Sequence, residues 1–266
     1  MKSAPRTVGL LLLVVLAGCS NGKIPLAYNF EEGDGTRYRW TIDSRTSVNS
    51  SSERSVTTTN MVVDVHEQVS GDDEPVLTIT LKPTSLSQGG AAMQTPPATT
   101  VKYQLNERGE ILNAVTDDLE GPAASAVQLG ATLIRSRIAL PAGPVGIGDE
   151  WDAPLVLDGD LGNIQLDGHG KLLGFELKGK RKLARIETSR TGEIVTHQQQ
   201  GGVPVRLRGS STTNAMSSLD VDNGVLYSSS AQLISDFDIA SQESGKLIGT
   251  MRVTLDSKLE LAPQPA

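Results

Sequence analysis

Regular alternation of apolar and polar residues is the feature that most limits how this chain can fold. Apolar side chains occupy every second position in segments 61–65, 77–81, 101–105, 173–177, 203–207 and 251–255. Successive side chains of a strand point to opposite faces, so a period of two predicts strands with one buried and one solvated face. Short turns such as Gly179-Lys180 separate these segments. The sequence therefore predicts a mainly β protein built of antiparallel meanders.

A helical pattern interrupts the alternation between Pro122 and about Ile138. Proline suits the first turn of a helix, and Pro141 lies just beyond the predicted end. One apolar stripe repeats at helical spacing, and it comprises Val127, Ala131, Ile134 and Ile138. We therefore expect one central, well-buried helix. The pattern leaves open whether this helix is core or a movable lid, and it favours the core.

The residues on either side of the predicted helix follow a similar order. Asp34 and Asp149 belong to Gly-Asp turns 115 residues apart, and the turn glycines Gly109 and Gly224 have the same offset. We therefore expect an internal duplication, with the helix joining half-repeats at about 28–116 and 143–261. The alternative is that any β-meander repeats such turns without duplication.

Two polar stretches carry no apolar period. Ser44–Thr59 is rich in Ser and Thr, which predicts either a pair of solvent-exposed edge strands or a mobile hairpin. Thr84–Thr99 contains Gly89-Gly90 and Pro96-Pro97, and we expect a long loop there. Both stretches are candidate surfaces for contact with a partner protein.

The sequence contains no recognisable catalytic or metal-binding motif. It has neither a G-x-S-x-G elbow nor an H-E-x-x-H pair, and His66, His169 and His197 lie far apart. Asp158–Asn163 and Asp220–Gly224 superficially resemble the start of a calcium loop. Neither has the full set of oxygen ligands, so we interpret both as turns. We assign no catalytic, cofactor-binding or metal-ligating residue.

The N-terminal residues form an export signal. Lys2 and Arg6 precede an apolar run from Val8 to Leu16, far shorter than the roughly 20 residues of a membrane-spanning helix. The next residues, Leu16-Ala17-Gly18-Cys19, resemble the lipobox of bacterial lipoproteins. The resemblance implies cleavage before Cys19, a diacylglyceryl thioether on its sulfur and acylation of its new amine.

This resemblance sets the expected layout of the chain. Residues 1–18 are then the signal peptide, 19–27 a lipidated tether, 28–261 the β-rich domain and 262–266 a flexible tail. Asp beside the lipidated cysteine tends to retain such proteins at the inner membrane. Ser20 stands there instead, so we expect the periplasmic face of the outer membrane, in a host that has one.

Charge and composition exclude several function classes. The formal charge is −7, and loss of Lys2 and Arg6 with the leader makes it −9. Binding to nucleic acid requires a basic face, which argues against that function for so acidic a domain. Anionic head groups also repel an acidic domain, so the lipid on Cys19 must hold it at the membrane. The chain has one cysteine, which leaves no disulfide framework.

A lipobox followed by strands around one helix is similar to the lipoprotein-localisation-factor superfamily. The resemblance implies an antiparallel sheet curved into a half-open barrel, with helical segments on its concave side and a cavity for acyl chains. Our leading hypothesis is accordingly a non-catalytic, membrane-anchored domain that binds a lipid or other apolar ligand. The alternative is a structural or assembly lipoprotein that binds another envelope protein, and an enzyme of unrecognised type is the least favoured.

Overall fold

The computed structural model of this chain describes residues 22–29, 35–50, 54–70, 75–106, 110–115, 129–130, 132–135, 137–159, 162–200 and 203–263. Cys19 and the predicted signal peptide lie outside these residues. Thirteen strands are present in the described part: β1 (Thr36–Ser50), β2 (Arg54–Ser70), β3 (Val76–Gln88), β4 (Ala91–Ala92), β5 (Thr99–Leu105), β6 (Ile111–Val115), β7 (Glu150–Asp152), β8 (Leu155–Gly159), β9 (Gly162–Lys178), β10 (Arg181–Gln200), β11 (Val203–Asp220), β12 (Val225–Ser241) and β13 (Leu247–Leu261).

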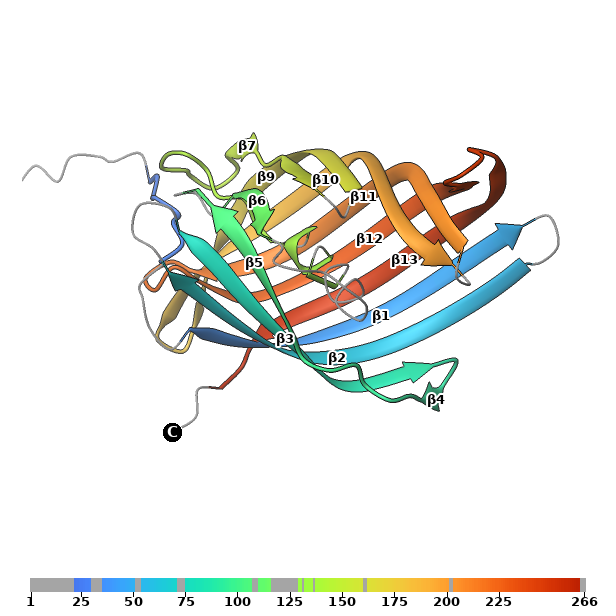
Figure 1. The fold of residues 1–266 in the computed structure, drawn as a ribbon. Helices are drawn as coiled ribbons and strands as arrows, with labels where there is room; N and C mark the ends of the chain where they lie inside the picture. The colour runs from blue at the N-terminus through green and yellow to red at the C-terminus, as the bar shows by residue number, and fades with distance from the viewer. Residues whose placement is uncertain are drawn as a thin grey trace, which may run out of the picture.

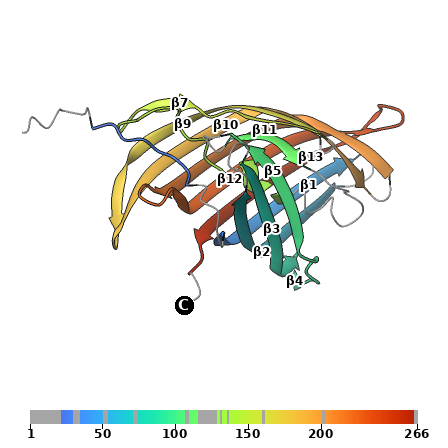
Figure 2. The same ribbon diagram turned by 60° about the vertical axis from the view of Figure 1, so that its left-hand side comes forward.

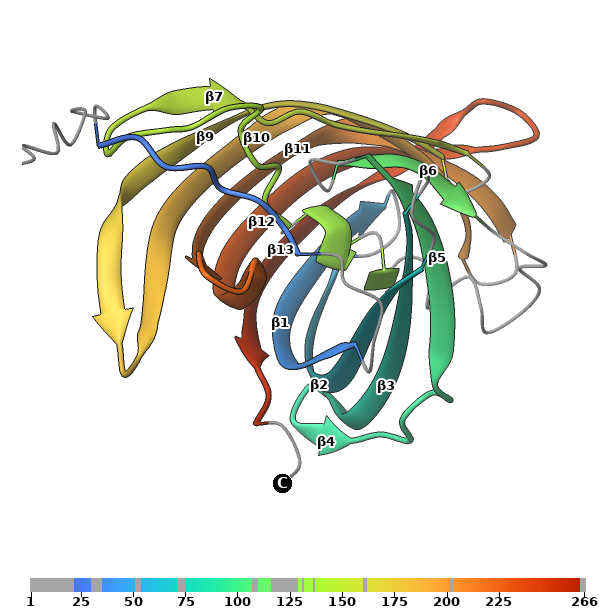
Figure 3. The same cartoon turned by 90° about the vertical axis from the view of Figure 1, so that its left-hand side faces the viewer.

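All of these strands belong to one antiparallel sheet (Figure 1). Its order is β6-β5-β3-β2-β1-β13-β12-β11-β10-β9-β7, while β4 pairs with β3 and β8 with β9. The two meanders, β1–β3 and β9–β13, meet where β1 pairs with β13. At the far ends of the sheet β6 lies close to β8, so the sheet curls around a trough (Figures 2 and 3). The predicted mainly β, half-open barrel is confirmed.

The inner face of this sheet carries the hydrophobic core. On β1, Tyr38, Trp40 and Ile42 are buried, whereas Arg37 and Arg39 are exposed. The predicted strands near 63–65, 77–81, 101–105 and 205–207 bury their apolar side chains in the same way. The alternation in the sequence therefore reports which face of each of these strands points into the trough.

The strand face predicted at residues 173–177 holds only in part, because Phe175 packs against the core but Leu177 does not. Leu172 is fully buried in β9, whereas Leu177 is 80% exposed. The pairing of β9 with β10 shifts register there, because Arg185 pairs with Gly174 and the next residue, Ile186, pairs with Leu172. A period of two holds only within an unbroken register, so this β-bulge moves the buried set by one residue.

The two polar stretches also differ from expectation. Ser44–Thr59 does form the ends of two strands, but neither is an edge, since β1 also pairs with β13 and β2 with β3. Within Thr84–Thr99, β3 continues to Gln88, and a turn at Gly89-Gly90 leads into β4. Backbone pairing with a strand on each side therefore holds these polar segments within the sheet.

The described part of the predicted helix lies inside the trough (Figure 3). Residues 129–130 and 132–135 are helical, and Leu133 and Ile134 are each 1% exposed. Ile138 is equally buried but follows the helix, because Arg137 is already non-helical. Val127 and Ala131 lie outside the described residues. No helix of the described residues is long and apolar enough to cross a membrane.

Residues 24–29 close one end of the trough. Ile24 exchanges two backbone hydrogen bonds of 2.9 Å with Val145, and Leu26 is buried. The Asn29 amide donates to the carbonyl of Gly224, whose φ of 61° and contact with Asn29 suit only glycine. Residues 24–27, which the sequence assigns to the tether, are therefore packed against the β-rich domain.

Candidate functional site

Residues 133–135 and 137–145, here called the crossing segment, run through the trough between opposite walls of the sheet. One wall is β2, which contributes Glu67, and the other is β10, which contributes Arg190. Five apolar residues of the segment belong to the buried core: Leu133, Ile134, Ile138, Leu140 and Val145. The crossing segment is therefore anchored on both sides by polar contacts and packed by apolar ones.

An ion pair joins the crossing segment to β2. Arg137 donates to Glu67 over 2.6 Å, and both side chains are 9% exposed. The guanidinium also lies 5.3 Å from the ring centre of Tyr28, whose hydroxyl donates to the carbonyl of Ile138. Burial alone would lower the pKa of Arg137, but the adjacent Glu67 carboxylate raises it above its ordinary value. The Arg137 guanidinium therefore stays charged in the interior.

Arg190 joins the same segment to β10. Its Nε donates to the carbonyl of Ala153, and its Nη1 donates to the carbonyls of Arg135 and Arg137, all over 2.8 Å. Burial lowers its pKa to about 10, so it stays protonated at neutral pH. Its side chain lies over Gly168, the residue paired with it on β9. Arg190 therefore holds the C-terminal end of the helix against β10.

Glycines on the inner face of β9 make room for these contacts. A Cβ on Gly168 would stand 2.5 Å from Arg190 Cγ and 2.7 Å from the Ala153 carbonyl oxygen. A Cβ on Gly170 would stand 2.4 Å from the ring of Trp151, whose indole nitrogen donates to the Ala139 carbonyl over 2.7 Å. A side chain at either glycine would displace the wall from the crossing segment.

Gly168→Ala is accordingly expected to destabilise the protein by about 1–3 kcal/mol, the usual cost of overpacking. The measurement is the melting temperature, which should fall by several degrees. Gly174→Ala on the same strand is the matched control, since a Cβ there meets nothing within 4 Å. Equal melting temperatures for the two variants would show that Gly168 is not needed for the packing of Arg190 against β9.

Arg135 is a third arginine at this place, and its side chain is half-buried. Its Nε is inaccessible to solvent and has no hydrogen-bond partner. Burial, with no compensating charge, lowers its pKa to about 10, so it too is protonated at neutral pH. Among the described residues, the crossing segment and the walls beside it thus hold three guanidinium groups and the carboxylate of Glu67, and the Glu110 carboxylate lies close enough to Arg190 to oppose the effect of burial on its pKa.

Small polar residues line the inner face of β10, β11 and β12. Two cross-strand serine pairs satisfy each other, Ser217 with Ser229 at 2.9 Å and Ser235 with Ser211 at 2.8 Å. Thr188 and Thr213 are both 3% exposed, and the hydroxyl of each lacks a hydrogen-bond partner. Buried hydroxyls of this kind are uncommon, and each requires an explanation.

An apolar strip follows on the neighbouring strands. Its members lie on the inner face of β1, β2 and β13 and are only half-buried: Val48, Met61, Met251, Val253 and Leu255. The polar and apolar parts of the inner face are continuous, because Arg190 pairs with Thr213, Thr213 with Leu233, and Leu233 with Leu255. The inner face is therefore amphipathic across the strands.

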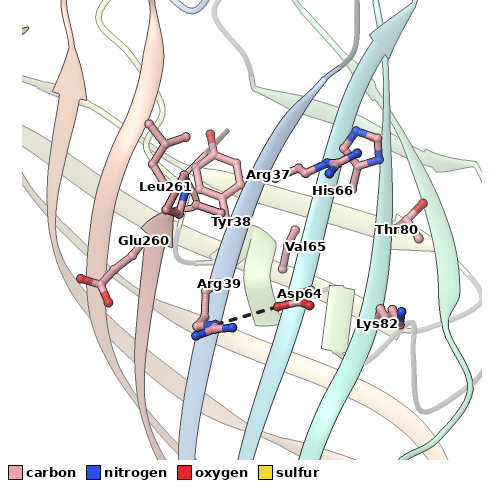
Figure 4. A pocket seen from close by; sticks show the side chains of 12 residues that line it. Arg37, Tyr38, Arg39, Asp64, Val65, His66, Thr80, Lys82, Glu260 and Leu261 are labelled. Atoms are coloured by element: carbon pink, nitrogen blue, oxygen red, sulfur yellow. Dashed lines mark ion pairs between the residues drawn. The ribbon is translucent and has the colours of Figure 1, made fainter. Parts of the chain in front are cut away.

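A separate groove of about 900 Å³ lies on the outer face of β1, β2 and β3, beside the end of β13 (Figure 4). Its exposed basic side chains are Arg37, Arg39 and Lys82, and Arg39 lies 3.9 Å from Asp64. Because charged side chains line this groove and it is open to solvent, it differs from the apolar cavity that the family resemblance implies.

The two segments that resemble the start of a calcium loop lie at turns between paired strands. Asp158 pairs with Asn163 across the β8–β9 turn. The carboxylate of Asp220 accepts hydrogen bonds from Asn223 and forms an ion pair with the guanidinium of Arg181, 2.9 Å away. Its oxygens are therefore occupied by the turn itself, and no group of three or more potential metal ligands occurs in the described ranges.

The structure brings together only part of the predicted site. Ile134 and Ile138 contact the core, while Cys19, Val127 and Ala131 lie outside the described residues. The arginines and Glu67 were not predicted. One signal was present for Arg190, because it has the same strand parity as the buried Ile186 and Ile194.

Comparison with known proteins identifies no family. No protein-family model matches the sequence, and no curated protein matches it. One similar solved structure, described as "Lipid-protein interactions in lipovitellin", has a TM-score of 0.45 and 12% sequence identity. The match covers 90% of this chain and 26% of that one, so this chain spans about a quarter of the length of that protein.

Proposed function

We propose that this protein is a non-catalytic, membrane-anchored envelope lipoprotein that binds a lipid or similar amphipathic ligand on the concave face of its sheet. The observation that carries the proposal is the half-buried apolar strip on the inner face of β1, β2 and β13. Apolar side chains inside a curved sheet normally pack against other protein groups, and those left partly open are suited to an apolar ligand. Met61 and Met251 add side chains that adapt to irregular chains.

The anchor supports the same proposal. Ile24 is already packed against Val145, and a lipid on Cys19 would be only five residues away. Five extended residues reach at most about 18 Å. Lipidation would thus hold the trough within a short distance of the membrane surface, where lipids are the most abundant ligands.

The test is native mass spectrometry of the full chain, purified in detergent from a bacterial host that lipidates proteins, with organic extraction of copurifying molecules. We expect one amphiphile per chain and fresh uptake from phospholipid vesicles. Val253→Asn, on the apolar strip, should reduce this uptake, whereas the exposed neighbour Arg252→Asn should not. A ligand-free protein that takes up nothing from vesicles would contradict the proposal.

A second candidate function is binding to another envelope protein, and the outer-face groove at Arg37 and Lys82 favours it. Crosslinking in intact cells distinguishes the two functions. A stoichiometric protein partner, together with no extractable amphiphile, would favour assembly over lipid binding.

A further inference from the structure

The described residues balance the charges in the trough only in part. Near the crossing segment these residues include three arginines and two carboxylates, that of Glu67 and that of Glu110, which interacts electrostatically with Arg190. Charged side chains are rarely buried unless they are paired, because removal from water is costly. The excess of positive charge therefore needs either solvent or an anion.

Two of the three arginines have ion-pair or hydrogen-bond partners for their guanidinium groups. Arg137 is paired with Glu67, and Arg190 donates to three backbone carbonyls. Arg135 differs, because within the described chain its guanidinium has no ion pair and its buried Nε has no acceptor. Its place at the end of a helix favours a cation, but this effect is weak in so short a helix.

Hydroxyl donors lie on the wall to which Arg135 is attached. The carbonyl of Arg135 accepts from Arg190 on β10, and Arg190 pairs in register with Thr213. Thr188 lies two residues before Arg190 on the same face of β10. Both threonine hydroxyls are buried without a partner, and a hydroxyl can donate to an anionic oxygen.

The apolar strip begins beside this polar group. From Thr213, the register leads across β12 and β13 to Leu233 and Leu255. Neighbouring strands are about 4.8 Å apart, so Leu255 lies roughly 10 Å from Thr213 along the inner face. A ligand could therefore place a charged head at Arg135 and an apolar chain over β12, β13 and β1.

We propose that Arg135, with the hydroxyls of Thr188 and Thr213, recognises the acidic head of an amphiphile, either a carboxylate or a phosphodiester. This inference rests on the proposed function and names the chemical class of its ligand. A guanidinium forms paired, charge-assisted hydrogen bonds with both kinds of anion, and a partly desolvated site strengthens them.

The experiment compares acidic and neutral amphiphiles on the full chain in detergent. The probes are palmitate and phosphatidylglycerol, their neutral counterparts hexadecanol and diacylglycerol, and inorganic phosphate alone. We expect the acidic amphiphiles to bind at least about tenfold more tightly than the neutral ones, as charge-assisted bonds predict. Arg135→Gln should abolish this preference and leave binding of the neutral probes unchanged, while Arg135→Lys should restore part of it.

Matched variants keep the test decisive. Arg185→Gln removes an exposed arginine from the outer face of β10 and should change nothing. Thr213→Val keeps the side-chain shape and should weaken the preference for acidic probes even if Arg135→Gln fails to fold.

The outcomes separate the inference from the proposed function. Equal binding of acidic and neutral probes, or an unchanged preference in both Arg135→Gln and Thr213→Val, would overturn the inference and leave lipid binding intact. Binding of inorganic phosphate alone, without competition by amphiphiles, would also overturn it, in favour of a small-anion site. Failure of every amphiphile to bind the unmodified chain would overturn both.

Discussion

Arg137→Met is expected to destabilise the fold by about 3–5 kcal/mol, the usual cost of removing one partner of a buried ion pair. Glu67 would be left in the core with its carboxylate only 9% exposed and without its guanidinium partner. The crossing segment would also lose the contact of the Arg137 guanidinium with the Tyr28 ring, although the hydrogen bond from Tyr28 to Ile138 would remain. For a chain of this size the melting temperature should fall by roughly 6–20 °C. Thermal unfolding followed by circular dichroism measures the change.

Two further variants identify the cause of this loss. Arg45→Met makes the same substitution at an exposed position on β1 and should change the melting temperature little. Adding Glu67→Gln to Arg137→Met should recover part of the lost stability, because it removes the unpaired charge. If Arg137→Met lowered the melting temperature no more than Arg45→Met, the ion pair would not contribute to the stability of the fold.

The sheet could be predicted because its signal is local. Leu77, Ile79 and Leu81 are all buried on one face of β3, as their spacing indicates. The bulge between β9 and β10 could not be predicted, because it depends on the register of two strands and not on the composition of either. Pairing of β1 with β13 likewise joins opposite ends of the chain, where no local pattern extends.

The candidate site was less predictable than the fold. Glu67 and Arg137 are 70 residues apart, and either one alone resembles an ordinary surface charge. The apolar stripe directed attention to Ile134 and Ile138, which the structure places in the core. The polar residues between them, Arg135 and Arg137, contact or face groups from other strands, and only the folded chain brings those groups together.

Cys19→Ser is expected to abolish attachment to the membrane and processing of the leader. In the unmodified protein we expect an intact mass that lacks residues 1–18 and includes a diacylglyceryl group and an added acyl chain. Two or more chains give stable anchoring, and the acidic mature domain has no net attraction to anionic head groups that could replace them. The variant should therefore retain its uncleaved leader and, without acyl chains, leave the alkali-washed membrane fraction almost completely.

The chain offers a direct readout because Cys19 is its only cysteine. A maleimide label on the denatured protein should fail to react, since a thioether has no free thiol. Ser20→Ala, next to the proposed lipid, should remain unlabelled and membrane-bound, and so controls for mutation near the cleavage site. A maleimide-reactive thiol in the unmodified, membrane-bound protein would disprove lipidation, and the membrane would then have to hold this acidic domain through a protein partner.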